Sequence, residues 1–264
     1  YLTACHGRPT GCRNPVNLSR LGVSNHTNLI THTVRNMQLT KQLTLGLLAM
    51  LFSFSAMAET ALPGIKGAKE GVHYDLINPA QPTTAPAGKV EITEMFWYGC
   101  PHCFRFEPYV KGWLKKKSDD IVFKRVPAML SPKWESHARA FYAAEVLGVT
   151  DKLHEPLFLA LHVEKKRIYK EEDIFNFVEG LGIDREKFIN AYKSFGVSSK
   201  VQQSKKLGKA YNLSGVPSII INGKYTTSAS QAGSFEGLAV LMNALALQEL
   251  ETMGSAPIEK AAAK

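Results

Sequence analysis

The sequence has little cysteine and, in its first 58 residues, no acidic side chain. Four cysteines in 264 residues exclude a disulfide-dense miniprotein. A hydrophobic content of 45% with 21% charged residues also excludes a disordered tail and a collagen. The chain shows no internal repeats, and its length is sufficient for one or two packed domains.

Residues 37–58 have the pattern of a secretory signal peptide. Lys41 stands near the start, an apolar run follows from Leu43 to Phe54, and Ala56-Met57-Ala58 forms an A-x-A cleavage site. The apolar run is too short to span a bilayer, and a buried core helix is the competing interpretation. We expect cleavage after Ala58 and export to a compartment where disulfides persist. Residues 1–36, which are polar and aperiodic, are expected to be a non-native upstream extension.

Removing this leader changes both the charge and the cysteine content. The formal charge of +9 falls to +4, because residues 1–58 hold five basic and no acidic side chains. The remaining basic clusters are short and fall at expected helix ends, so no nucleic-acid binding is predicted. Only Cys100 and Cys103 remain. Two cysteines three positions apart close too small a loop to stabilise a fold, so their value must be chemical.

The chain after the leader begins with a β-α-β pattern. Val90 to Trp97 is rich in apolar and β-branched residues and is followed by the turn-forming Tyr98-Gly99-Cys100-Pro101. A helix is expected from Cys100 to Lys117, with a proline in its first turn and a kink at Pro108. Ile121 to Val126 is the second strand, and a right-handed crossover makes the two strands parallel.

Five short helices are expected next, over Lys133 to Leu147, Asp151 to Leu161, Glu171 to Leu181, Asp184 to Phe195 and Ser198 to Tyr211. A strand from Ser218 to Ile221 then meets Asn222-Gly223, a strong hairpin signal, with Lys224 to Thr226 as the antiparallel partner. Ser234 can cap a last helix that runs to about Met253. This order predicts an α/β protein with a thioredoxin-like fold and an inserted all-helical domain.

The predicted organisation divides the chain into six parts. They are the upstream extension (1–36), the signal peptide (37–58), the first part of the thioredoxin-like domain (59–130), the inserted helical domain (131–211), the second part of the thioredoxin-like domain (212–253) and a flexible tail (254–264). The helical block thus separates a β-α-β half from a β-β-α half.

Cys100-Pro101-His102-Cys103 is a C-x-x-C motif that opens a helix directly after a strand, which is a specific signal in a β-α-β context. The free N–H groups and the dipole of a helix N-terminus stabilise an anion, so Cys100 should lose its proton more easily than a free thiol. Cys103 lies one turn further along and should be more shielded. We therefore expect Cys100 to be the exposed nucleophile and Cys103 the resolving thiol, with His102 lowering the pKa of Cys100 further.

A stabilised thiolate also sets the direction of the reaction. Each pKa unit contributes about 1.4 kcal/mol in favour of the reduced form, or roughly 30 mV for a two-electron couple, so the disulfide form becomes a stronger oxidant. A structural disulfide and a zinc site are the alternatives. The first closes too small a loop, and the second lacks two further ligands because the chain has no second C-x-x-C and no closely spaced His pair.

Charged residues interrupt both expected strands of the β-α-β unit. Glu94 shares one face of its strand with apolar residues, and Lys124 does the same in the next strand. If the strands are neighbours, Glu94 and Lys124 can pair beneath the active-site helix. A buried Glu94 could then accept or relay the proton as Cys103 becomes a nucleophile. A salt bridge without a catalytic part is the alternative.

Val216-Pro217 immediately precedes the third strand. A proline at this position can simply mark the strand start, but an X-Pro bond there can also be cis. A cis bond beside the C-x-x-C motif would expose the N–H and C=O groups of Val216 for β-type pairing with an extended polypeptide.

These motifs resemble those of the DsbA family of thiol:disulfide oxidoreductases. The similar segments are Glu94 to Glu107, which contains the C-P-H-C motif, and Gly215 to Tyr225, which contains the Val216-Pro217 loop. The resemblance implies that Cys100 is the nucleophile, that Cys103 is buried, and that the Val216-Pro217 bond is cis and binds substrate. It also places Glu94, Glu107 and Lys124 at the positions of the family's charged network.

The resemblance implies a periplasmic monomer that donates disulfides to newly exported or unfolded cysteine-containing polypeptides and needs no cofactor. A membrane partner of the DsbB type, which passes electrons to quinone, would reoxidise it. A low cysteine pKa and an oxidising potential are established for DsbA and are carried over as expectations. One departure is Pro108, which many members lack; it concerns the helix geometry and not the motif.

Two other functions compete with disulfide donation. A reductase or isomerase of the same fold would share the motif, although dedicated isomerases resemble dimers with a separate dimerisation domain, and the roughly 30 residues before Val90 are too few for one. A non-enzymatic holdase would use an apolar groove near the motif. Replacing Cys100 with Ser separates the two classes, because only a holdase would keep its activity.

Overall fold

The computed structural model describes residues 67–255. The expected upstream extension, the signal peptide and all but the first two residues of the expected tail lie outside this range. Within it, no helix is both long enough and apolar enough to cross a membrane.

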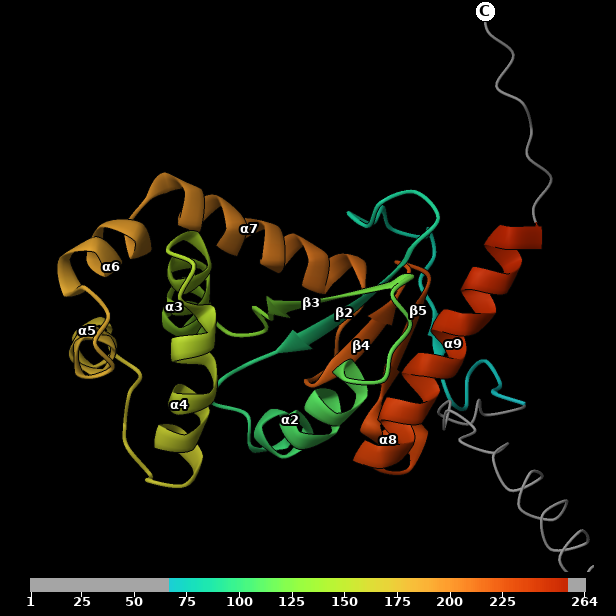
Figure 1. Cartoon of the computed structure of the whole chain (residues 1–264), viewed down its shortest axis with the longest axis horizontal. Coiled ribbons are helices and arrows are strands. Elements are labelled where there is room, and N and C mark those ends of the chain that lie inside the picture. Colours follow the sequence, from blue (N-terminus) through green and yellow to red (C-terminus); the bar gives the residue numbers. More distant parts are fainter. Residues whose placement is uncertain (1–66, 256–264) are drawn as a thin grey trace, which may run out of the picture. The chain divides into compact units, whose positions relative to one another are not determined.

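A five-stranded mixed sheet forms the centre of the described chain (Figure 1). Its strands are β1 (Asp75–Leu76), β2 (Val90–Phe96), β3 (Ile121–Pro127), β4 (Ser218–Ile221) and β5 (Tyr225–Ser228). The order across the sheet is β1-β5-β4-β2-β3, with β2 parallel to β3 and antiparallel to β4. The parallel pair joined by a helix is the predicted β-α-β unit, whereas β1 was not predicted.

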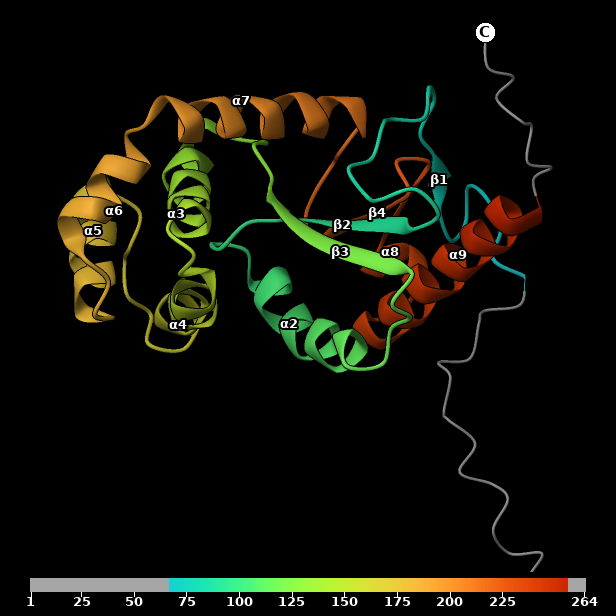
Figure 2. The ribbon, with the colours of Figure 1, turned by 45° about the horizontal axis from the view of Figure 1, so that its top comes forward.

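Helices cover both faces of this sheet. Figure 2 shows the strands between α7 (Phe195–Ala210) on one side and α2 (Pro101–Leu114) with α9 (Phe235–Ser255) on the other. The core on the α2 side includes Val90 and Ile92 of β2 packed with Phe106 and Trp113 of α2, all at most 2% exposed. Alternate residues of β2 therefore face two different helical layers, as the period of a strand requires.

The inserted helices have a core of their own. They are η1 (Pro132–Trp134), α3 (Glu135–Val146), α4 (Thr150–His162), α5 (Glu171–Gly180), α6 (Arg185–Tyr192) and α7. Their buried side chains, such as Leu157 and Phe188, form one cluster that continues to Phe96, Cys100 and Cys103. The predicted α/β fold with an all-helical insertion is confirmed, and the two cysteines lie where the insertion meets the sheet.

The predicted element boundaries are close to those observed, with informative differences. The active-site helix ends at Leu114 rather than Lys117. In the β4–β5 hairpin Ile221 pairs with Tyr225, so the loop takes three residues and the second strand starts one residue later than predicted. Gly223 has a φ of +65°, and a Cβ atom there would lie 2.0 Å from the carbonyl oxygen of Gln81, so the turn requires glycine. The four-residue helix α8 (Ala229–Ala232) was not predicted.

Candidate active site

The two cysteines occupy the first turn of α2. Cys100 is the N-cap residue, with φ −89° and ψ 117°, and Pro101 is the first helical residue. Both thiols are reduced. Cys103 is fully buried and Cys100 is only 8% exposed. Cys100 is thus the more accessible thiol, as predicted, but the expectation that it is openly exposed is wrong.

A loop from the other half of the sheet covers Cys100. The Val216-Pro217 peptide bond is cis, as expected. When it is protonated, the thiol of Cys100 donates a hydrogen bond to the carbonyl oxygen of Val216, with a distance of 3.4 Å between the two atoms. This contact joins residues 116 positions apart and accounts for the low exposure of Cys100.

The environment separates the pKa values of the two thiols. The pKa of Cys100 falls to about 6, chiefly because the Cys103 thiol donates a hydrogen bond to it. Backbone N–H groups of the first turn add to this effect, and the charge of His102 contributes least. Burial raises the pKa of Cys103 well above its ordinary value, and the hydrogen bond and charge of Cys100 add to that rise. At neutral pH the thiolate is therefore on Cys100 and the proton is on Cys103.

Gly99 has a steric role just before the motif. A Cβ atom at this position would lie 2.3 Å from the indole ring of Trp97. That ring is fixed in turn by stacking on Trp134, with the ring centroids 4.5 Å apart. Only glycine fits between the aromatic pair and Cys100 without a shift of the backbone or the ring.

A buried ion-pair network lies beneath α2, but its cation differs from the predicted one. In the β2–β3 register Glu94 pairs with Arg125, and Lys124 pairs with Thr93. Paired positions place their side chains on the same face, so Arg125 reaches Glu94, with 3.0 Å between Nε and Oε2. Lys124 points to the opposite face and forms a 2.8 Å ion pair with Glu91. The predicted Glu94–Lys124 pair is wrong.

Glu94 is the least satisfied carboxylate of the network. Its side chain is fully buried, and its Oε1 atom has no hydrogen-bond partner. Burial raises the pKa of Glu94 to about 7, although the charge of Arg125 opposes the rise. The charge of Glu94 in turn helps to raise the pKa of Cys103. The Glu94 carboxyl group is therefore poised to hold or release a proton next to the buried thiol.

Glu107 links this network to the inserted helices. Arg125 Nη2 lies 3.1 Å from both carboxylate oxygens of Glu107, and His154 Nε2 lies 3.0 Å from Oε1. Burial raises the pKa of Glu107, but the hydrogen bond from His154 and the charge of Arg125 outweigh it, so the net shift is downward. Burial also lowers the pKa of His154. A neutral His154 can donate from Nε2 to Glu107 and accept at Nδ1 from the Tyr98 hydroxyl, 3.0 Å away.

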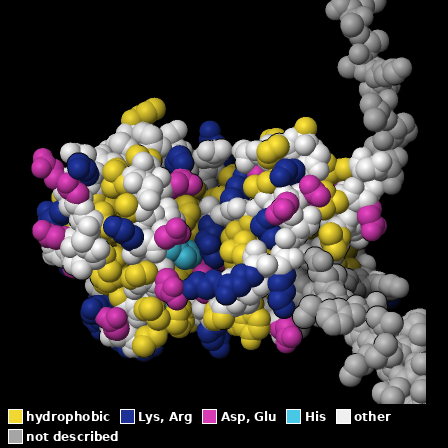
Figure 3. Space-filling view, in the orientation of Figure 1, with side chains coloured by type: hydrophobic (Ala, Val, Ile, Leu, Met, Phe, Trp, Pro, Cys, Tyr) yellow, Lys and Arg dark blue, Asp and Glu magenta, His cyan; other side chains and the backbone are white. Residues whose placement is uncertain are grey.

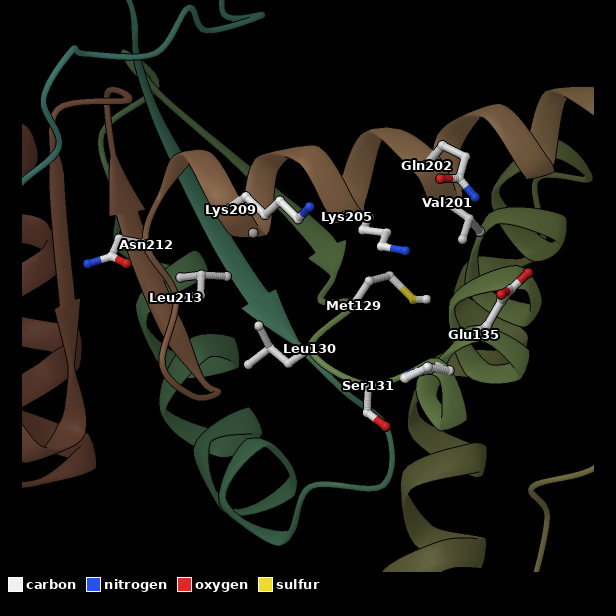
Figure 4. A pocket seen from close by; sticks show the side chains of 12 residues that line it. Met129, Leu130, Ser131, Glu135, Val201, Gln202, Lys205, Lys209, Asn212 and Leu213 are labelled. Carbon is white, nitrogen blue, oxygen red and sulfur yellow. The ribbon is translucent and has the colours of Figure 1, made fainter.

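Several depressions lie on the described part of the chain, and of four with well-formed linings only one is lined by both the C-x-x-C motif and the cis loop. A groove of about 530 Å³ is lined by His102 together with Val216 and Pro217. A second depression, of about 520 Å³, lies between the segment after β3 and α7 and is lined by Met129, Lys205 and other residues (Figure 4). No residue of the C-x-x-C motif or of the cis loop lines this second depression. The first groove is therefore the one where a polypeptide can approach Cys100.

Comparisons with known proteins show the family of this chain. Residues 109–240 match the family described as DSBA-like thioredoxin domain. The thiol:disulfide interchange protein DsbA of Burkholderia cepacia is 39% identical over 206 residues, covering 78% of this chain and 93% of the relative. The chain belongs to the DsbA family. Its relatives include DsbA of Azotobacter vinelandii, 38% identical over 75% of this chain and 92% of the relative.

Solved DsbA structures share the fold. The crystal structure of Pseudomonas aeruginosa DsbA has a TM-score of 0.69 and 35% identity and covers 73% of this chain and all of that chain. The oxidoreductase DsbA of Xylella fastidiosa has a TM-score of 0.64 and 29% identity, with 69% of this chain and 97% of that chain covered. As a DsbA-family member, the protein is a thiol:disulfide oxidoreductase.

Sequence reasoning missed three residues of the buried network beneath α2: Tyr98, Arg125 and His154. Arg125 stands beside the residue that was chosen, and only the strand register distinguishes the two. His154 lies 47 positions after Glu107 in a separate helix, and no spacing rule connects them. Among residues 67–255, no group of three or more His, Cys, Asp or Glu side chains is arranged to hold a metal ion.

Proposed function

We propose that the oxidised Cys100–Cys103 pair donates its disulfide to exported polypeptides. A substrate thiolate attacks Sγ of Cys100, the Cys100–Cys103 bond breaks, and Cys103 leaves with the electron pair and takes up a proton. The substrate's second thiolate then attacks the substrate sulfur of the mixed disulfide and displaces Cys100 as a thiolate. The substrate dithiol loses two electrons and two protons, and the enzyme dithiol gains the two electrons.

The low pKa of Cys100 is the observation that carries this proposal. A pKa of about 6 makes Cys100 a good leaving group, so mixed disulfides resolve toward oxidised substrate. At pH 7 the thiolate stabilises the reduced enzyme only by the part of the pKa shift that lies below pH 7, because a thiol with a pKa above 7 is already protonated. The thiolate then favours the reduced enzyme by about 1.4 kcal/mol more than an ordinary thiol would, or roughly 30 mV.

Glu94 is proposed as the group that exchanges the proton with Cys103. Its raised pKa, near 7, allows the carboxyl group to be protonated before Cys103 leaves and ionised afterwards. Arg125 and Glu107 are proposed as positioning residues, since they contact Glu94 directly or through one another. The role first expected for Lys124 passes to Arg125.

The cis loop and the adjacent groove are proposed to bind substrate in an extended form. Val216 and Pro217 line the groove, and the carbonyl oxygen of Val216 already lies 3.4 Å from the Cys100 sulfur. A polypeptide that pairs with the Val216 backbone would bring its own sulfur toward Cys100. Pro101 and His102, both exposed at the start of α2, border the same approach.

The cellular setting is proposed on family grounds and on the leader sequence. We propose that the enzyme is a periplasmic monomer exported by the signal peptide over residues 37–58 and reoxidised by a DsbB-type membrane quinone reductase. We also propose that the inserted domain spans residues 131–211. Helices α3 to α7, which share one apolar core, support that boundary.

Equilibration with glutathione buffers, combined with quantification of the Cys100–Cys103 disulfide, tests the proposed direction. A potential clearly more oxidising than the roughly −270 mV of thioredoxin is expected. A potential as reducing as that of thioredoxin would instead indicate a reductase.

Two cysteine variants complete the test on a peptide with two cysteines. Cys100→Ser should abolish oxidation of the peptide, whereas retained function would indicate a holdase. Cys103→Ser, mixed with the disulfide form of the same peptide, should accumulate a mixed disulfide through Cys100, because the Cys100 thiolate can attack the peptide disulfide and no Cys103 thiol is present to release the peptide. A mixed disulfide that accumulates in Cys100→Ser instead of Cys103→Ser would contradict the assigned roles.

A further inference from the structure

The groove beside Cys100 is lined by apolar, basic and hydroxyl side chains. Val216 and Pro217 of the cis loop, His102 and Arg105 of α2, and Phe235 of α9 all line it. Most of the other lining side chains are hydroxyls, from Ser214, Ser218, Ser228, Ser230 and Ser234. Hydroxyl groups can donate hydrogen bonds to an anionic or polar side chain.

The charge of this groove is of one sign. Among the described residues that line it, His102 and Arg105 are the bases, and no carboxylate is present. Arg105 is exposed, with its guanidinium 5.7 Å from the centre of the Phe235 ring, and it has no ion-pair partner in the described chain. Lys111, further along the same helix, is neutralised by Glu155 at 2.7 Å. The positive charge of Arg105 is therefore available to a ligand.

We infer that this groove selects substrate segments that carry an aspartate or glutamate close to the reacting cysteine, with Arg105 as the specificity-determining residue. The inference rests on the proposed function. Arg105 is five residues along the helix from Cys100, a rise of roughly 7.5 Å, and an extended peptide advances about 3.3 Å per residue. A carboxylate about two residues from the substrate cysteine is thus within reach of Arg105.

An apolar substrate segment is the occupant that the lining disfavours. The largest apolar side chain of the groove, Phe235, has the Arg105 guanidinium over its ring, so an apolar ligand would have to displace or desolvate that charge. A carboxylate would instead keep the guanidinium in place and pair with it. Exposed ion pairs are weak, so the selectivity is expected to be about 1.5- to 5-fold in rate.

A matched peptide series tests the inference. Peptides with two cysteines carry Glu, Gln, Lys or Leu at single positions up to three residues on either side of the first cysteine. Their oxidation by the disulfide form is followed at low and high salt. The wild-type enzyme is expected to prefer Glu over Gln over Lys at one or two of these positions. Higher salt should reduce the Glu-to-Lys ratio, because exposed charges are screened.

Variants decide whether Arg105 is responsible. Within each variant the Glu-to-Lys rate ratio is the readout, so a general change in rate does not affect the result. Arg105→Met should bring the ratio close to one, and Arg105→Glu should invert it. Lys116→Met, which removes an exposed cation outside the groove, should leave the wild-type ratio unchanged.

The possible failures are distinct. A wild-type ratio near one, or the same ratio in Arg105→Glu as in the wild type, would overturn the inference while leaving disulfide donation intact. A wild-type preference for apolar residues at these positions would show that the groove takes an apolar segment instead. If the Gln peptides are not oxidised at all, the proposed function itself fails.

Discussion

Two buried glutamates at opposite ends of the sheet have opposite environments. Glu249 of α9, 2% exposed, accepts hydrogen bonds from Asn222, Lys224 and Tyr225 at 2.6 to 2.9 Å. Glu94 lies under the dithiol with one oxygen unpartnered. Burial raises the pKa of each, but the three donors outweigh it at Glu249, whose net pKa is lowered, while at Glu94 burial prevails.

This difference separates a carboxylate that stabilises the fold from the one that we propose exchanges a proton with Cys103. Glu249 ties the last helix to the β4–β5 hairpin, and its fully satisfied charge stabilises the fold. Glu94 costs stability when it ionises, because its solvation is only partly replaced. Groups with such perturbed pKa values concentrate at functional sites, and Glu94 lies next to the pair that exchanges electrons.

The largest expected effect is the difference in stability loss between substitutions of Arg125, the partner of Glu94, and Lys224, the partner of Glu249. Arg125→Met would leave Glu94 and Glu107 buried together without their shared partner, and should lower the free energy of unfolding by about 3 to 5 kcal/mol. Lys224→Met removes a half-exposed lysine whose partner keeps two other donors, so about 1 kcal/mol or less is expected. Urea denaturation of both variants measures this. Equal losses of unfolding free energy in the two variants would contradict the difference between the two glutamate environments.

Glu249→Gln is expected to have the next largest effect. The amide keeps the shape of the carboxylate but loses its charge, and one of its ends cannot accept a hydrogen bond, so the free energy of unfolding should fall by about 2 kcal/mol. Peptide oxidation at a temperature where the variant is folded should not change, because Glu249 contacts the hairpin and not the dithiol. A changed oxidation rate would show that this end of the sheet also serves the reaction.

The two glutamates should also give pH dependences of opposite sign. The folded-state pKa of Glu94 is raised from 4.5 to about 7. The native state therefore binds more protons than the unfolded state between these values, and Glu94 lowers stability as the pH rises through this range. The pKa of Glu249 is lowered, so its contribution is present above its unfolded pKa and is lost as the pH falls through its folded pKa.

Denaturation curves from pH 4 to 8 test this sign difference in the reduced protein. Relative to the wild type, Glu94→Gln should gain stability as the pH rises toward 7, on the order of 3 kcal/mol. Glu249→Gln should lose stability relative to the wild type at all these pH values, and less so at the acidic end. A Glu94→Gln difference that does not change with pH would contradict a raised pKa of Glu94.

The smallest effect is expected for Lys124→Met. Lys124 is partly exposed, and Glu91 keeps the hydroxyl and N–H groups of Thr84 as partners at 2.6 and 2.9 Å. A loss of about 1 kcal/mol or less and an unchanged pH profile of peptide oxidation are expected. A large shift of that pH profile would indicate that Lys124 does interact with Glu94, which contradicts the strand register.

Local signals explain what could be predicted from the sequence. The strand, turn and helix around Cys100, the hairpin at Asn222-Gly223 and the strand Ser218–Ile221 each depend on neighbouring residues, and the structure has them at or near the predicted positions. The residues alone left the Val216-Pro217 bond open, since a proline there can simply mark the strand start, and the cis bond was expected from the resemblance to the DsbA family. Strand β1 and helix α8 were missed because two and four residues are too short to show a period.

Contacts between distant segments explain what could not be predicted. A shift of one residue in the β2–β3 register exchanges Lys124 for Arg125 on the face of Glu94. The partnership of Glu107 with His154 depends on how α4 packs against α2. The low exposure of Cys100 depends on the Val216 loop. The redox chemistry of the C-x-x-C motif could be predicted from the sequence, whereas the residues that shift the pKa values around it are brought together only by the fold.

The pKa of Cys100 is the central quantity of this account. A pH titration of the thiolate ultraviolet absorbance of the reduced protein measures it directly, with Cys100→Ser as the control that identifies the signal. A midpoint near pH 6 is predicted, because the Cys103 thiol and the N–H groups of the first helical turn stabilise the thiolate. A midpoint at or above the value of about 8.5 for a free cysteine would contradict the account.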